Sequence, residues 1–95
     1  DRDSLLQAAR RAYWNNDLSA AESAYITLIA AYPGDADAFG ELGNLYEAMG
    51  MTSESLDAYY EAGMRLKAAG ERAKLQQVID LFEREKDPRV DELRR

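Results

Sequence analysis

The amino-acid sequence predicts a single all-α domain spanning residues 1–95, built from a repeated pair of helices. The chain aligns with itself when Ser19 is placed on Ser53, and the same shift places Tyr25 on Tyr59. Apolar residues recur at helical spacing, and clusters of Asn, Asp, Gly and Pro interrupt them at regular intervals. This 34-residue period with helical patterning is typical of stacked helix-turn-helix units. With 95 residues and 46% hydrophobic content, the chain suffices for one core and not for two.

Five helices are expected, two in each repeat and one after them. They lie near residues 3–15, 18–32, 36–49, 53–69 and 71–85. Repeat 1 then covers about residues 2–35, repeat 2 covers about 36–69, and a capping helix with a tail takes 70–95. We also expect a marginal sixth helix that ends at Leu93 and has Pro88 in its first turn.

Turn and capping residues define the ends of these helices. Within the repeats, Asn15-Asn16-Asp17 and Gly50-Met51-Thr52 occupy equivalent places, and each is followed by a serine, Ser19 or Ser53, which is the expected N-cap of the next helix. Between the repeats stands Pro33-Gly34-Asp35. Proline stops a helix, glycine tolerates a positive φ and aspartate can cap the helix that follows, so this segment separates the two units.

Small and aromatic residues at equivalent positions predict how the helices pack. Gly43 and Ala9 allow the partner helix to cross closely, because a larger side chain would hold the two helices apart. Further small residues on the second helix of each pair are Ala21, Ser55 and Ala62. The aromatic residues expected to fill the spaces between successive helices are Tyr25, Phe39, Tyr46 and Tyr59.

These residues resemble the signature of the tetratricopeptide repeat family. In repeat 2 the matching residues are Phe39, Leu42, Gly43, Tyr46, Gly50, Ser55, Tyr59 and Ala62. Repeat 1 resembles the signature more loosely and has Asn16 where a turn glycine is usual. The resemblance implies a right-handed α-solenoid of two repeats. After Gly70 the register slips by about two residues, and an apolar stripe with charged residues around it predicts a capping helix.

The composition excludes most catalytic and metal-binding chemistry. The chain has no cysteine and no histidine, so it lacks thiolate ligands, a cysteine nucleophile and the commonest general base. The segment from Asp35 has carboxylates at calcium-loop spacing, but Phe39 and Tyr46 stand where two oxygen ligands are required. We therefore expect no enzymatic activity, no cofactor and no metal site.

Charge is distributed unevenly along the chain. The formal net charge is −6, and the stretch between Ala12 and Met64 holds nine acidic residues without a lysine or arginine. An acidic centre opposes binding to nucleic acid, and no stretch is apolar enough to insert directly into a membrane. The same charge favours a basic or apolar protein partner over an acidic C-terminal tail, and a solvated face that keeps the domain in solution explains it equally well.

The family resemblance implies where a partner would bind. In tetratricopeptide proteins the first helix of each unit lines a concave groove that holds a peptide. Carried over by position, the groove-facing residues are Asp3, Leu6, Gln7, Arg10, Tyr13 and Trp14 from repeat 1, and Asp37, Glu41, Asn44 and Glu47 from repeat 2. The predicted partner-binding residues within this set are Arg10, Tyr13, Trp14, Glu41, Asn44 and Glu47.

Several of these residues have expected roles. Tyr13 and Trp14 form an adjacent aromatic pair that can anchor a partner, with the alternative that Trp14 packs on the turn or under the next repeat. Asn44 can hydrogen-bond a peptide backbone, and Arg10 can take a carboxylate. The carboxylate clamp of chaperone-binding relatives is not expected, because its positions hold Leu6, Gly40 and Glu41.

Two functions from different classes remain open. The first, which the resemblance favours, is a non-enzymatic scaffold that binds a peptide or protein partner, as a module of a larger, bacterial-type assembly protein. The second is a self-association module that forms a homo-oligomer by repeat stacking or helix exchange. The sequence leaves the compartment open, since cytoplasm and periplasm are both compatible with a chain that has no cysteine.

Overall fold

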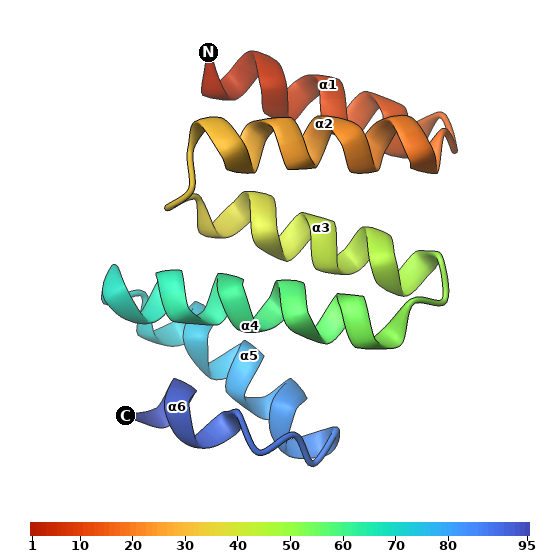
Figure 1. The fold of residues 1–95 in the computed structure, drawn as a ribbon. Helices are drawn as coiled ribbons and strands as arrows, with labels where there is room; N and C mark the ends of the chain where they lie inside the picture. The colour runs from red at the N-terminus through yellow and green to blue at the C-terminus, as the bar shows by residue number, and fades with distance from the viewer.

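The computed structural model describes residues 1–95 and consists of six α-helices without a β-strand (Figure 1). The helices are α1 (Arg2–Trp14), α2 (Leu18–Ala31), α3 (Ala36–Ala48), α4 (Thr52–Ala68), α5 (Arg72–Arg84) and α6 (Val90–Arg94). The all-α class is confirmed, and the five longer helices agree with their expected bounds to within one residue at each end. None of the helices has the length and apolar character needed to cross a membrane.

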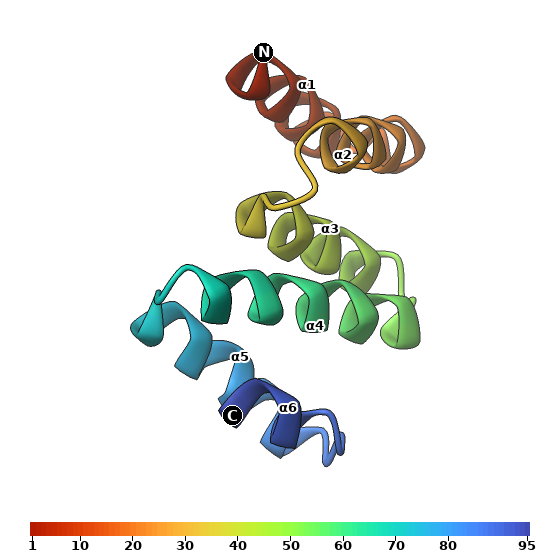
Figure 2. The same ribbon diagram turned by 60° about the vertical axis from the view of Figure 1, so that its left-hand side comes forward.

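The helices form one stack in chain order. Each helix from α1 to α5 packs against the next, and α6 packs against both α5 and α4. Figure 1 shows α1 at one end of the stack with α5 and α6 at the other, and the turned view in Figure 2 shows the same order. The molecule measures 35 × 28 × 19 Å, so most residues lie close to a surface.

The period of the sequence appears in the backbone. Helix α3 begins as far after α1 as α4 begins after α2, and this distance along the chain equals the sequence period. The turns inside the two pairs each place one residue in the left-handed region, Asn16 at φ 59° and Gly50 at φ 73°. Asparagine is the non-glycine residue that best tolerates this conformation, which explains its presence at the glycine position. Helix α5 begins at Arg72, two residues later than the period would place it, which confirms the expected slip.

Two expectations about caps and turns are wrong. Ser19 and Ser53 are not N-caps, because α2 and α4 begin directly after the left-handed turn residue and its successor, which places both serines inside the first helical turn. Asp17 caps α2 instead, accepting a hydrogen bond from the Ala20 amide, whereas α4 has no side-chain cap. Gly34 does not adopt a positive φ, so the turn between the pairs does not depend on that property. The expected cap at Asp35 is confirmed by its bond from the Ala38 amide.

The helices of the second pair approach closely at Gly43. A β-carbon at this position would lie 2.7 Å from two carbons of the Tyr59 ring, and the Ser55 hydroxyl donates a hydrogen bond to the Gly43 carbonyl at 2.9 Å. The expected role of small residues is therefore confirmed here. A second close approach, at Gly63, was not expected: a β-carbon there would lie 2.7 Å from the Leu93 side chain.

Helix α6 is a structural part of the core. Leu93 is only 1% exposed and packs with Phe82 and Ile79 of α5. The Lys67 ammonium group donates a hydrogen bond to the Glu92 carbonyl, which ties α6 to α4. The sixth helix is therefore well anchored rather than marginal. It begins at Val90, so Pro88 lies before the helix and not in its first turn.

Candidate functional site

The six residues predicted to bind a partner lie together on one face of α1 and α3. A hollow of about 240 Å³ is lined by Arg10, Tyr13, Trp14, Tyr25, Glu41 and Asn44. A neighbouring hollow of about 370 Å³ is lined by Tyr13, Asn44, Glu47 and Ala48. We call the two together the α1–α3 groove. The groove forms because the equivalent faces of two helices, one from each repeat, lie next to each other.

Trp14 projects into solvent at the end of α1. Its side chain is 82% exposed, the largest value among the large apolar residues. The Tyr13 ring meets it edge-on, with the ring centroids 6.2 Å apart and an angle of 87° between the planes. Tyr13 is half-buried and packs on the core, so its ring is a fixed support for the Trp14 ring. The alternative that Trp14 packs on the turn or under the following unit is therefore wrong.

Arg10 and Glu41 pair with each other across the groove. The Arg10 Nε and Nη2 atoms donate to the two carboxylate oxygens of Glu41 at 2.9 and 2.5 Å, and the Tyr25 hydroxyl donates to Glu41 at 2.8 Å. The hydrogen bonds that Arg10 donates to Glu41 raise the pKa of Arg10, and burial followed by the same carboxylate raises the pKa of Tyr25. Arg10 thus takes a carboxylate from its own chain and is not a free cation for a partner.

Tyr59 of α4 positions Asn44 and Glu47. Its hydroxyl donates to the Asn44 Oδ1 atom and also lies 3.2 Å from Glu47 Oε2. The Asn44 amide nitrogen makes no hydrogen bond within the chain, so it can donate to a peptide carbonyl. Burial, together with the charge of Glu47, raises the pKa of Tyr59 to about 12. Tyr59 was expected only as a core residue. Tyr25, which lies 34 residues earlier, also donates to a residue of α3, Glu41, so the two tyrosines reach α3 from the helices before and after it.

The groove continues past α3 onto α5. A third hollow of about 260 Å³ is lined by Glu47, Thr52, Ser55, Leu56, Tyr59, Leu81 and Glu85. It shares Glu47 with the α1–α3 groove, so the two adjoin at this residue. Sequence reasoning did not place Leu81 or Glu85 beside this groove.

One residue expected to face the groove lies in the core. Leu6 is 4% exposed and belongs to the central apolar cluster, because it continues the stripe of Ala9 and Tyr13 on the side of α1 that faces α2.

Ion pairs with arginine reduce the negative charge that the sequence predicts for the groove. Arg2 contacts Asp3 and Asp37, as Arg10 contacts Glu41, whereas Glu47 has no ion-pair partner.

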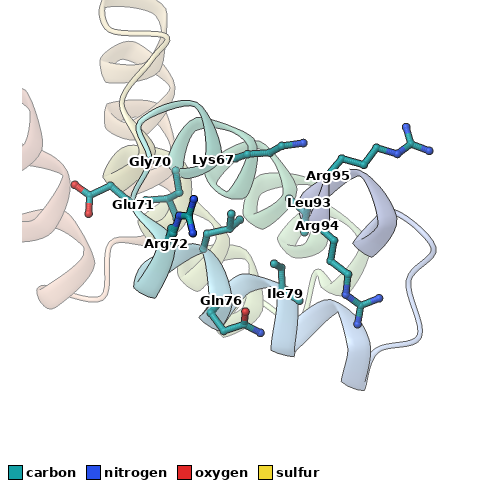
Figure 3. Close-up of a pocket in the computed structure, with 11 residues that line it drawn as sticks. Lys67, Gly70, Glu71, Arg72, Gln76, Ile79, Leu93, Arg94 and Arg95 are labelled. Atoms are coloured by element: carbon teal, nitrogen blue, oxygen red, sulfur yellow. The ribbon is translucent and has the colours of Figure 1, made fainter.

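The largest cavity lies elsewhere, at the other end of the stack. It has a volume of about 540 Å³ and lies between the C-terminal end of α4, α5 and α6 (Figure 3). Gly70 and Glu71 of the α4–α5 turn line it, together with Leu93 of the five-residue helix α6. Arg94 and Arg95 at its edge form ion pairs with Glu83 and Glu92. None of the predicted binding residues lines this cavity.

The chain places no group of three or more His, Cys, Asp or Glu side chains where they could hold a metal ion. Comparison with models of known protein families gives no match, and comparison with curated proteins gives no relative. The functional argument therefore rests on the geometry of the groove and on the chemistry of its residues.

Proposed function

We propose that the chain is a non-enzymatic interaction scaffold that binds an extended segment of a partner protein in the α1–α3 groove. The observation that carries this proposal is the 82% exposure of Trp14 beside a hollow that it helps to line. A tryptophan held against Tyr13 presents a large apolar surface to water, and covering that surface is favourable. Tryptophan and tyrosine are also the residues that contribute most often to the binding energy of interfaces.

The proposal includes a fold type, a right-handed α-solenoid of two tetratricopeptide-type repeats closed by α5 and α6. The equal spacing of the two helix pairs along the chain supports it. So do the left-handed residues at equivalent positions, Asn16 and Gly50, and the close contact of Gly43 with Tyr59. In such a solenoid the first helix of each pair faces the binding groove, and these are α1 and α3 here.

The groove favours a particular partner chemistry. At one end Trp14 and Tyr13 suit an apolar or aromatic side chain. In the middle the Asn44 amide can donate to a backbone carbonyl, and Arg10 with Glu41 forms a neutralised pair that adds no net charge. Beyond them, the unpaired carboxylate of Glu47 favours a basic side chain. An extended segment with an apolar residue followed by a basic one fits this order better than an acidic tail.

The alternative, a homo-oligomer built by stacking repeats, has weaker support. Stacking would cover the outer face of α1 as α2 covers α3. On α3 that face contributes Ala38, Leu42 and Leu45, which are all buried. The equivalent residues of α1 are Ser4, Ala8 and Arg11, which are all exposed. Burying the Arg11 charge without a partner would oppose stacking at this end, so α1 resembles a solvent-facing end of an array.

Selection of random peptides displayed on phage tests the proposal. We expect enriched peptides to share an apolar residue followed by a basic one, and to bind the Trp14→Ala variant at least about tenfold more weakly than the wild type. Tyr32→Ala, which removes an exposed aromatic residue outside the groove, is the matched control and should bind normally. Peptides that bind Trp14→Ala as tightly as wild type would contradict the proposal.

Light scattering at low and high salt separates the scaffold from the self-association module. A monomer of about 10.7 kDa at both salt concentrations supports the scaffold. A defined oligomer that the Trp14→Ala variant does not form would show that a second copy occupies the groove, and would favour the alternative.

A further inference from the structure

A second groove lies on the opposite side of α3 from the α1–α3 groove and does not depend on the proposed function. We call it the back groove. It has a volume of about 290 Å³ and is lined by Phe39, Leu42, Tyr46, Glu54, Asp57, Ala58 and Glu61. At about 3.6 residues per turn, Phe39, Leu42 and Tyr46 point away from the side of α3 that carries Asn44. The rings and Leu42 form its apolar floor, and carboxylates of α4 form one rim.

One end of the back groove already holds a guanidinium group of the chain itself. Arg65 lies over the Phe39 ring, 4.1 Å from its centroid. Its Nη1 atom contacts Glu61 Oε1 at 2.6 Å, and its Nε atom donates to the Pro33 carbonyl at 2.7 Å. An aromatic face below and a carboxylate beside it are the two features that bind a guanidinium in proteins. This end of the back groove therefore binds an arginine side chain of the chain itself.

The same arrangement recurs two helical turns away, without its arginine. Tyr46 follows Phe39 by seven residues on α3, and Glu54 precedes Glu61 by seven residues on α4. Because α3 and α4 form an antiparallel hairpin (Figure 1), both shifts move about 10 Å in the same direction along the groove. Seven residues before Arg65 stands Ala58, whose methyl group cannot reach the ring or the carboxylate. Ala58 is itself only 6% exposed, and the hollow that it lines with Tyr46 and Glu54 is where a guanidinium from outside would lie.

The charges around the second position suit a cation. Glu54 is exposed and has no ion-pair partner, in contrast to Glu61. Glu22 of α2 accepts a hydrogen bond from the Tyr46 hydroxyl at 2.8 Å and adds a second carboxylate. Burial, followed by the hydrogen bond to Glu22 and the charges of Glu22 and Glu54, raises the pKa of Tyr46 to about 12. Asp57 contributes less, since it is paired with Arg89 at 2.8 Å.

We propose that Tyr46, Glu54 and the space above Ala58 form a docking site for an arginine side chain of a basic segment in a partner protein. The site lies on the opposite face of α3 from Trp14 and Asn44, so it can be occupied while the α1–α3 groove is filled. A chain with both sites would hold two segments, or two parts of one partner, on its two faces.

An NMR titration tests this site. The probe is the acetylated, amidated pentapeptide Gly-Ala-Arg-Ala-Gly, compared with the same peptide carrying citrulline, which keeps the shape of arginine without its charge. We expect the arginine peptide to shift the amide resonances of Tyr46, Glu54 and Ala58, and the citrulline peptide to bind at least about fivefold more weakly. Equal binding of both peptides would overturn the proposal.

Three variants locate the bound arginine. Glu54→Gln should weaken binding about fivefold, whereas Glu71→Gln, a matched change at an exposed carboxylate just before α5 that lines neither groove, should leave it unchanged. Ala58→Arg should fill the site from within and abolish binding, and its helical circular dichroism shows whether it folds. If it does not fold, the comparison of Glu54→Gln with Glu71→Gln decides. Unchanged binding to Glu54→Gln would overturn the site.

Two further outcomes define the site and its occupant. Trp14→Ala should bind the arginine peptide normally, so failure of the α1–α3 groove proposal and failure of this one are distinguishable. A concentration-dependent dimer that Glu54→Gln dissociates would show that an arginine of a second copy is the occupant, and would overturn a partner protein in that role.

Discussion

The ring of Tyr59 lies against Gly43 so closely that a β-carbon on Gly43 would stand 2.7 Å from two of its carbons. This contact sets how near α4 can approach α3. It also places the Tyr59 hydroxyl where it reaches Asn44 and Glu47 in the α1–α3 groove. One glycine therefore couples the packing of the second helix pair to the geometry of the candidate site.

Substitution of Gly43 tests this coupling. Gly43→Ala should lower the free energy of unfolding by about 1 to 3 kcal/mol, because the overlap with Tyr59 outweighs the better helix propensity of alanine. Gly40→Ala is the matched control on the same helix, where a β-carbon would meet nothing within 4 Å. It should raise the free energy of unfolding by about 0.5 to 1 kcal/mol. Urea denaturation measures both, and equal effects of the two variants would contradict the argument.

The anchoring of α6 predicts a large effect at Leu93. Leu93→Ala removes a side chain that is 1% exposed and fills the space over Gly63, so it should lower the free energy of unfolding by about 2 to 5 kcal/mol. Arg94→Ala changes an exposed neighbour and should cost less than about 1 kcal/mol. Thermal unfolding followed by circular dichroism checks this. If α6 were only marginally anchored, Leu93→Ala would lower the free energy of unfolding no more than Arg94→Ala does.

Trp14 should affect binding without affecting folding. Because its side chain is 82% exposed, Trp14→Ala should change the free energy of unfolding by less than about 0.5 kcal/mol. Tyr13→Ala should cost about 1 to 3 kcal/mol, since Tyr13 packs on the core. Denaturation of the two single variants measures the difference. A destabilisation of Trp14→Ala equal to that of Tyr13→Ala would mean that the tryptophan is a packing residue.

Acid should destabilise the fold through Asp35 and Asp87. Hydrogen bonds from Arg2 and Arg89 hold the pKa values of these two carboxyl groups below their usual value. A carboxyl group with a lowered folded pKa stabilises the fold above its unfolded pKa of about 3.9, and this stabilisation is lost as the pH falls through the folded pKa. The free energy of unfolding should therefore decrease between about pH 5 and about pH 2.

The variant Asp87→Asn checks this assignment. It should be less stable than the wild type at pH 7 and show a shallower dependence on pH in urea denaturation, because one titrating group is gone. Asp91→Asn, which removes an exposed carboxylate without an ion-pair partner, should keep the slope of the wild type. An unchanged slope for Asp87→Asn would place the acid sensitivity at other carboxylates.

Local signals in the sequence were sufficient to find the helices. Asn16 and Gly50 end the first helix of each pair, and Asp35 caps the helix that begins the second pair, because these properties depend on one residue and its neighbours. The N-caps predicted at Ser19 and Ser53 were wrong, because the helices begin before these serines and sequence patterns do not resolve a helix end to within one or two residues.

The sequence predicted most of the residues that line the α1–α3 groove but not the hydrogen bonds between them. The equivalence of the two repeats brought Tyr13, Trp14 and Asn44 to one face, and the structure places them there. The pairing of Arg10 with Glu41 was not predicted, because it depends on the distance between two helices that are not neighbours in the chain. The contribution of Glu85 was missed since it depends on where α5 lies after the register slip.

The sequence by itself determined the all-α class, the bounds of five helices and the face of α1 and α3 on which the predicted residues gather. Each of these follows from interactions within one or two helical turns, or from the period of the repeat. Only the tertiary structure decided that Leu6 and Leu93 are buried, that Trp14 is exposed and that Arg10 is neutralised. These outcomes depend on the distances and angles between helices, which many weak packing contacts set together and which no local pattern records.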